Sequence, residues 1–409
     1  MNNPLNFGNI ETKTTKRGVD VWLKALPEEP FRLFFPLGVM VSLIGVSLWP
    51  LLYGEWLTFY PGVAHARMMM GGFVGAFSLG FLGTSLPRMI GAPPLRKWEL
   101  VLILALYLLA VVGYANGRIV VGDAGMLSVL VFFFVAMSIR LIFMRQDVPP
   151  PGFVLVGLGW LGAMAGLLIF LLEGDTQFVV TGVRHRMAEL LLYQGFILLP
   201  ILGIGGFLFP RFVGLKTLQM FKESRTPPPG WNSKALQAIG IGGTVIFSFW
   251  VECSGWLLVA GGMRLAVVVW YLWREVLVFS KSTEKGTLAL GLRLGLTLIV
   301  VAFVLTPLYP AQRIGMDHMI FISGFGMIAV TVASRVTLGH SGHSEKLGKK
   351  LWVMRVVIWS IFIAMMSRVT ADFTPTIRVS HLNYASLGWA IAFLVWLGWI
   401  GRNFFQKEK

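Results

Sequence analysis

The sequence is poor in cysteine and in charged residues, and each shortage excludes a class of protein. Its one cysteine, Cys253, rules out an intramolecular disulfide and a thiolate cluster for zinc or iron–sulfur. Charged residues make up 13% of the chain, whereas a soluble protein carries about a quarter. Hydrophobic residues make up 56%, so this chain cannot hide its apolar surface in a water-soluble core. A mean hydropathy of +0.73, with 31 Phe and 15 Trp, indicates a protein surrounded by lipid.

The fold is predicted from the long apolar stretches of the sequence. A helix needs about 20 apolar residues to cross the roughly 30 Å of hydrocarbon in a bilayer. Twelve such stretches can be drawn, near 31–53, 63–86, 98–115, 119–139, 152–173, 186–209, 236–252, 255–273, 287–309, 315–334, 356–370 and 383–401. The seventh and eighth are the least clearly separated, because only residues 252–255 offer a turn between them. We therefore predict an all-α, polytopic membrane helix bundle of about twelve transmembrane helices.

Basic residues dominate the net charge of +16, and their distribution along the twelve spans decides what this charge means. With the N-terminus placed in the cytoplasm, 26 of the 35 Lys and Arg fall in cytoplasmic segments, 7 in or beside external ones, and two, Arg67 and Arg293, inside spans. This asymmetry follows the positive-inside rule, so we predict cytoplasmic N- and C-termini in a bacterial inner membrane. It also favours topogenic charge over nucleic-acid binding. The first 30 residues are polar, so the first span is expected to remain as a signal anchor.

Independent soluble domains are not expected, because the longest polar segments are too short to fold alone. The predicted organisation is a cytoplasmic segment 1–30, a six-span half 31–209, a cytoplasmic linker 210–235, a second six-span half 236–401 and a cytoplasmic tail 402–409. No clear internal repeat is visible, which does not favour an inverted-repeat transporter.

Four of the six histidines are predicted to gather at the external face. His65, His185, His318 and His381 precede or open spans two, six, ten and twelve, which all enter the membrane from outside. Facing imidazoles can be the axial ligands of a haem, whose propionates need cationic partners. The candidate propionate partners are Arg67, Arg184, Arg186, Arg313 and Arg378. No C-x-x-C-H motif attaches a c-type haem, and the predicted cofactor is a non-covalent b-type haem.

Methionines beside two of these histidines add soft ligands. Met68 and Met69 follow His65, and Met319 follows His318. Histidine together with methionine suits copper, particularly Cu(I), so these five residues form a candidate copper site. The competing interpretation is that interfacial histidines are solvated and that the methionines fill an apolar core.

Other polar residues at depth support a different class of function. Asp123, Glu189 and Glu252 lie within spans or at their ends, and Arg293 could pair with one of these carboxylates. A proton or ion path through these groups would make the protein a secondary transporter. An accessory subunit of a membrane redox complex would need none of them. Colour separates the alternatives, because a haem protein has a Soret band and a transporter is colourless.

One segment of the sequence forms a recognisable pattern. Residues 335–342 read Arg-Val-Thr-Leu-Gly-His-Ser-Gly and follow a glycine-rich span. Arg335, Gly339 and His340 match the pattern Arg-x-x-Leu-Gly-His-[Ser/Thr]-Gly of the NnrS family, which the segment resembles. The second span resembles the same family in its Gly-Ala-Pro-Pro-Leu stretch at 91–95. The resemblance covers essentially the whole chain.

The resemblance implies a membrane protein that contains haem and copper and acts in the bacterial response to nitric oxide and nitrosative stress, often beside denitrification. His65 and His318 match family positions as well. The family commonly has His-x-His-Glu-Met where this chain has His65 to Met69, and Arg293 stands where the family has a histidine. Losing two imidazoles weakens the expectation of copper more than that of haem. The resemblance thus implies a protein in the lipid bilayer that has nitric oxide as its small-molecule ligand. It assigns no redox partner.

Overall fold

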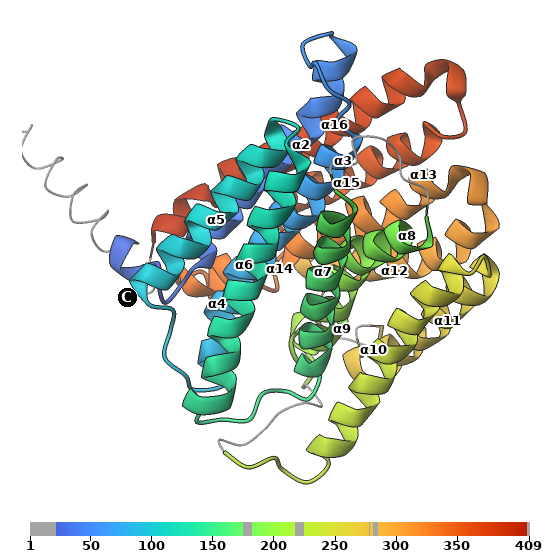
Figure 1. Ribbon diagram of the computed structural model, residues 1–409. Helices are drawn as coiled ribbons and strands as arrows, with labels where there is room; N and C mark the ends of the chain where they lie inside the picture. The colour runs from blue at the N-terminus through green and yellow to red at the C-terminus, as the bar shows by residue number, and fades with distance from the viewer. Residues whose placement is uncertain (1–21, 175–181, 217–224, 278, 281–284, 407–409) are drawn as a thin grey trace, which may run out of the picture.

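The computed structural model describes residues 22–174, 182–216, 225–277, 279–280 and 285–406, and the regular elements in this part are all helices. Within it, twelve helices are long and apolar enough to cross a membrane, and they coincide with the twelve predicted stretches. The predicted all-α polytopic fold is thereby confirmed (Figure 1). The side of the membrane on which the termini lie stays a prediction.

Several of the twelve spans consist of more than one helical segment. Spans 1 to 4 are α2 (Phe31–Tyr53); α3 (Gly62–Arg67), η1 (Met68–Val74) and α4 (Gly75–Met89); α5 (Lys97–Ala115); and α6 (Ile119–Ile139) with η2 (Arg140–Met144). Spans 5 to 8 are α7 (Phe153–Glu173); α8 (Val183–Glu189), η3 (Leu190–Gly195), α9 (Phe196–Leu208) and η4 (Phe209–Val213); α10 (Trp231–Cys253); and α11 (Leu257–Tyr271) with η5 (Leu272–Val276). Spans 9 to 12 are α12 (Thr287–Leu308); η6 (Pro310–Gln312), α13 (Arg313–His318), η7 (Met319–Gly326) and α14 (Met327–His340); α15 (Trp352–Thr370); and η9 (Pro375–Ile377), α16 (Arg378–Ile400) and η10 (Gly401–Phe405). A short helix, η8 (Ser344–Lys346), lies between spans 10 and 11.

The least clearly separated pair of predicted spans proves to be two helices. α10 ends at Cys253 and α11 begins at Leu257, and the two helices pack on each other. The turn between them depends on Gly255, whose φ of +92° is a conformation that other residues adopt only with strain. A turn this tight forces the two helices to be antiparallel neighbours.

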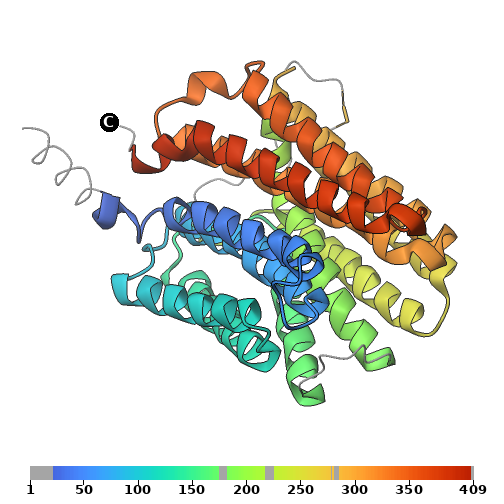
Figure 2. The ribbon, with the colours of Figure 1, turned by 90° about the horizontal axis from the view of Figure 1, so that it is seen from above.

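The twelve spans form three groups of four, and the helices of each group pack in the same pattern. In spans 1–4, α2 packs on α4 and α5 on α6; in spans 5–8, α7 packs on α9 and α10 on α11; and in spans 9–12, α12 packs on α14 and α15 on α16. The three groups close into a ring, because α6 packs on α7, α11 on α12 and α16 on α2 (Figure 2). The division into two six-span halves at 210–235 stays a prediction, whereas the packing divides the bundle into three groups.

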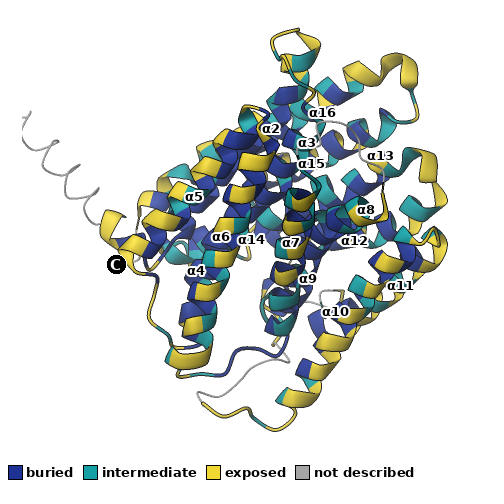
Figure 3. Ribbon diagram, viewed as in Figure 1, coloured by how far each residue is buried: buried dark blue, intermediate teal, exposed yellow. Residues whose placement is uncertain are grey.

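Spans 2, 6 and 10, the second of each group, form the centre of the bundle. The buried shares of their apolar windows are 83%, 78% and 67%, and none of the other nine spans exceeds 50%. Figure 3 shows the exposed residues on the outward faces of outer helices such as α11. Each central span has a short α-helix near its start that continues into a π-helix, namely η1, η3 or η7. Such π-helical turns are rare overall but frequent at functional sites, although η2 and η5 in spans 4 and 8 are π-helical too.

Glycines allow the first helix of each group to approach the central one closely. A Cβ atom on Gly159 of α7 would lie 2.6 Å from Pro200 Cδ, and one on Gly295 of α12 would lie 2.7 Å from Ile328 Cγ1. Gly38 of α2 has the same role in the first group, against α4. Close contact through small residues is the usual way in which membrane helices pack.

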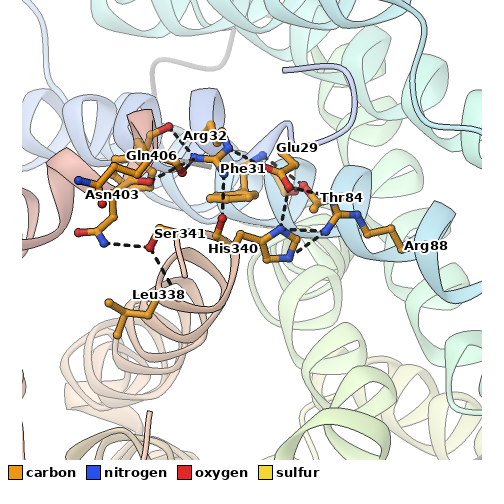
Figure 4. A network of polar contacts seen from close by, with 12 residues as sticks. Glu29, Phe31, Arg32, Thr84, Arg88, Leu338, His340, Ser341, Asn403 and Gln406 are labelled. Carbon is orange, nitrogen blue, oxygen red and sulfur yellow. Dashed lines mark hydrogen bonds and ion pairs between the residues drawn. The ribbon is translucent and has the colours of Figure 1, made fainter. Parts of the chain in front are cut away.

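The two ends of the described chain meet at the end of the bundle where span 1 begins and span 10 ends (Figure 4). Arg32 is only 2% exposed, and its Nη1 donates hydrogen bonds to the carbonyl oxygens of Asn403, Phe404 and Gln406 at 3.2, 2.8 and 2.6 Å. Its Nη2 donates to the carbonyl oxygen of His340 at 3.2 Å. These contacts place the start of span 1 and the end of span 12 on one side of the bundle, as an even number of spans requires.

Glu29, just before span 1, connects the same region to span 2. Its carboxylate accepts hydrogen bonds from Arg32 Nε at 2.5 Å and Arg88 Nη2 at 2.7 Å, and it lies 3.0 Å from His340 Nδ1. Burial raises the pKa of Glu29, but the hydrogen bonds to His340, Arg88 and Arg32 outweigh burial and bring the pKa down to about 2. Glu29 is therefore ionised at neutral pH and holds three spans together.

Candidate functional site

A cavity of about 850 Å³ lies at the end of the bundle where spans 2, 6 and 10 begin, which we call the cavity end. Its wall comes from these three central spans and from α2, α15 and α16. Phe73, Phe321 and Trp389 make part of the wall apolar, while other parts carry imidazole and guanidinium groups. The volume falls within the roughly 300–1,000 Å³ that is typical of small-molecule and cofactor sites.

Two of the predicted histidines line the cavity with one ring nitrogen held by backbone. His65 Nδ1 lies 2.8 Å from the Gly45 carbonyl oxygen, and His318 Nδ1 lies 2.6 Å from the Ile314 carbonyl oxygen. A carbonyl oxygen can only accept, so each Nδ1 carries the proton and each Nε2 keeps its lone pair. Ligating histidines are usually oriented in this way by a second partner.

Three arginines lie in the same cavity wall, and one of them was not predicted. Arg313 and Arg378 line the cavity as expected, and Arg368, in the last turn of α15, joins them. Both His65 and His318 interact electrostatically with Arg368. Arg368 is 8% exposed, and its Nη1 lies 3.1 Å from Asp372 Oδ1, which Arg378 Nη2 also approaches at 3.3 Å. One carboxylate therefore faces two guanidinium groups, which favours a further anionic partner.

The other two predicted histidines are placed differently. His185 lines the cavity, but its Nδ1 lies 2.8 Å from Glu173 Oε2 and its Nε2 lies 3.9 Å from Glu189 Oε1. His381 is not among the residues that form the cavity wall, and its Nδ1 lies 3.3 Å from the Ser367 hydroxyl. The ligand roles of these two residues stay predictions, and the geometry favours His65 and His318.

Arg67 lines the cavity but is already neutralised. Its Nε lies 2.8 Å from Asp123 Oδ1, it donates a hydrogen bond to the Tyr193 hydroxyl, and its guanidinium lies 3.7 Å from the centroid of the Phe170 ring. Tyr114 donates a second hydrogen bond to Asp123 Oδ1 at 2.8 Å. This network supports the junction between the first two groups of spans and leaves Arg67 little freedom to hold a propionate.

Arg186 is engaged by carboxylates in the same manner. It contacts Glu189 at 2.9 Å, Glu252 at 2.8 Å and Asp317 at 3.6 Å. Arg264 of α11 also pairs with Glu252. Arg184, the remaining predicted propionate partner, is exposed and does not line the cavity.

Three of the five predicted copper ligands lie in one cavity wall. Met69 lines the cavity with His65 and His318, whereas Met68 and Met319 are buried and are not part of its wall. Among the described residues no three His, Cys, Asp or Glu are grouped so that they could hold a metal ion. Two of the three methionines are thus buried in the core, and the copper site stays a prediction.

The carboxylates of the transporter interpretation all lie near the cavity end. Asp123 is in the first turns of α6, Glu189 ends α8 and Glu252 is one residue from the end of α10. Arg293, in the second turn of α12, lies towards the opposite end. An ion path needs groups spaced through the bilayer, so this grouping at one depth favours a local role for the carboxylates.

The family-matching motif lies at the far end of span 10, away from the cavity. The guanidinium of Arg335 lies 4.5 Å from the centroid of the Phe212 ring, and His340 belongs to the contacts around Glu29. A Cβ atom on Gly339 would meet nothing within 4 Å. The contacts of Arg335 and His340 are structural and connect span 10 to spans 6, 1 and 2.

A comparison with protein families finds one that covers nearly the whole chain. The family model described as NnrS protein matches residues 25–407. No curated protein matches the chain.

Proposed function

The chain belongs to the NnrS family, and from this premise we propose that it is a membrane haem protein of nitric oxide metabolism. In this proposal the cavity holds one non-covalent b-type haem, and the protein acts on nitric oxide or related nitrogen oxides or protects the cell from nitrosative stress. Copper is not part of the proposal, because only three of its five candidate ligands line the cavity.

The observation that carries the proposal is the combination of donors in one cavity wall. His65 and His318 each place Nδ1 against a backbone carbonyl oxygen, which leaves Nε2 for a ligand, and the buried Arg368 lies beside them and shares one carboxylate, Asp372, with Arg378. A haem needs both features, since its iron takes imidazole nitrogens and its propionates take cations. His65 and His318 would hold the haem iron, and Arg368, Arg378 and Arg313 would hold its propionates.

The residues of the cavity would have three tasks. The Gly45 and Ile314 carbonyl oxygens orient the two imidazoles, and the arginines fix the anionic edge of the ligand. The aromatic side chains supply apolar contact for the bound group. Bound there, haem would supply an iron that binds nitric oxide. Nitric oxide is small, uncharged and lipid-soluble, so it can reach the cavity through the bilayer.

Absorption spectra of purified variants test the assignment. Wild-type protein in detergent should show a Soret band, and its haem should be extractable into acidic acetone. His65→Ala and His318→Ala should lose or shift the band, because each removes a ligand, whereas His381→Ala should keep it. His381 is the matched control, since it opens a neighbouring span but does not line the cavity. Equal spectra in all three variants would refute the ligand assignment, and a colourless wild-type protein would refute the proposed function.

A further inference from the structure

An apolar groove of about 480 Å³ lies between span 8 and span 9. Span 8 contributes Val269, Leu272 and Trp273 to its wall, and α12 of span 9 contributes Thr297 and Val300. Trp273 is 72% exposed and Val269 is 43% exposed, so the groove opens to the outside of the bundle. It extends inward from the end opposite the cavity end, where span 8 ends and span 9 begins.

The inner part of the groove suits a hydrocarbon chain. Thr297 is the polar residue that α12 contributes, and its hydroxyl donates a hydrogen bond to the Arg293 carbonyl oxygen at 2.8 Å. A hydroxyl that is bonded within its own helix needs no partner from the lipid. Val269, Leu272 and Val300 offer the rest of this surface, and their side chains are wholly apolar.

Leu277 ends span 8 at the mouth of the groove in a backbone conformation that is rare for leucine. Its φ of +56° lies in the left-handed region, which glycine adopts without strain. Its N–H donates to the Leu272 carbonyl oxygen at 3.1 Å, and its own carbonyl oxygen accepts from Ser280 N–H at 3.0 Å. The resulting turn brings Leu277 and Phe279 into the groove wall. Such strain is often stored at functional sites, and a leucine at this position supplies a side chain that glycine lacks.

Arg293 lies on the groove side of α12, nearer the surface than the apolar residues. It is one helical turn before Thr297 and two turns before Val300, so the three side chains share one face of the helix. Arg293 is six residues from the start of α12 at Thr287, which corresponds to about 9 Å along the helix. A guanidinium on its long side chain can reach the polar surface of a bilayer from this depth.

Other charges at the mouth of the groove are mainly positive. Arg274 and Lys285 are exposed at the end of span 8 and just before the start of span 9. Glu275, in the same region, is buried and pairs with Lys234 at 3.0 Å. The mouth therefore attracts anions, while the groove below it accepts an apolar chain.

We propose that this groove binds an anionic phospholipid, with an acyl chain between spans 8 and 9 and the phosphate on Arg293. The apolar and basic parts follow one another along the spans in the order in which a phospholipid carries its chain and its phosphate. A guanidinium matches the geometry of a phosphate and can bind it through two hydrogen bonds. Basic pockets between transmembrane helices bind anionic head groups, and a tryptophan such as Trp273 is favoured at head-group level.

Native mass spectrometry of delipidated full-length protein tests the proposal, with phosphatidylglycerol and phosphatidylcholine of identical acyl chains as probes. Wild type should bind one phosphatidylglycerol about tenfold more tightly than phosphatidylcholine, because the net charge of the lipid meets the basic mouth. Arg293→Gln should weaken phosphatidylglycerol binding about tenfold, as expected for a lost charged hydrogen bond. The matched control is Arg355→Gln, which changes an exposed arginine of α15 at the same end of the bundle and should leave the affinity unchanged.

A second pair of variants tests the groove without changing its charge. Val300→Trp fills the groove and should weaken phosphatidylglycerol binding, whereas Val304→Trp, one turn further along α12 and outside the groove, should not. Glycerol 3-phosphate carries the charge without the chains and should not compete. Each variant is first shown to have the circular dichroism spectrum of wild type.

Three results would overturn the proposal. Equal affinities for the two lipids would show general lipid contact only, and competition by glycerol 3-phosphate would show a site for a free anion. Phosphatidylglycerol binding that neither Arg293→Gln nor Val300→Trp weakens would place the lipid elsewhere. Haem enters none of these measurements, so failure here leaves the proposed function standing.

Discussion

Glu29→Gln tests whether the contacts between the chain ends stabilise the fold. The carboxylate is 3% exposed and contacts Arg32, Arg88 and His340. Because the pKa of Glu29 drops from 4.5 to about 2 on folding, its ionised form stabilises the folded protein. This difference corresponds to about 3 kcal/mol, and to roughly 1–2 kcal/mol after screening by interfacial water.

The sign of the pH dependence follows from the lowered pKa. The stabilisation is fully present above the unfolded pKa of 4.5 and is lost as the pH falls towards about 2. Unfolding by sodium dodecyl sulfate in mixed micelles, followed by tryptophan fluorescence, should show Glu29→Gln to be less stable than wild type at pH 7 by roughly 1–2 kcal/mol. The gap should close between about pH 4.5 and about pH 2.

The matched control is Glu345→Gln, which changes an exposed carboxylate on the same side of the bundle. It should alter stability by less than about 0.5 kcal/mol at pH 7. Equal stability of Glu29→Gln and wild type at pH 7 would refute the reasoning. A gap that persists at low pH would show that the lost contacts do not depend on the charge of Glu29.

Three further predictions concern topology, the cavity arginine and the buried ion pair. Reporter fusions at residue 409 should report the cytoplasm and fusions in 54–62 the periplasm; an external C-terminus would contradict the positive-inside assignment. Arg368→Gln should raise the haem dissociation constant about tenfold or more in a haem-transfer assay, because a charged hydrogen bond is worth about 1.5–3 kcal/mol. An unchanged dissociation constant would show that Arg368 does not hold the haem. Asp123→Asn should lower detergent stability by about 3–5 kcal/mol by leaving Arg67 unpaired, and Arg67→Met in the same chain should restore most of the loss; no restoration would refute the pairing.

The positions of the spans could be predicted because apolar length alone decides whether a helix crosses a bilayer. Even the turn between spans 7 and 8 was visible, since Gly255 supplies the required conformation. The central place of spans 2, 6 and 10 was not visible. It depends on which faces pack together, and the sequence gives no strong periodicity to distinguish a lipid-facing side from a protein-facing side in a uniformly apolar helix.

The site was predicted only in part for a related reason. His65 and His318 were found because each opens a span at the same predicted depth. Arg368 was missed because it ends a span, although the span map placed it at the same face. Glu173 was missed as a partner of His185, since the two lie on different spans and only their packing brings them within 2.8 Å.

The most direct test of the central claim is the visible spectrum of the dithionite-reduced protein before and after nitric oxide is added. The account predicts that the wild-type protein shows a haem spectrum that changes on addition and saturates at one nitric oxide per haem. His65→Ala and His318→Ala should change this response, because each removes a residue that would hold the iron, and His185→Gln should keep it. A wild-type haem spectrum that does not respond to nitric oxide, or a purified protein without any haem spectrum, would contradict the account.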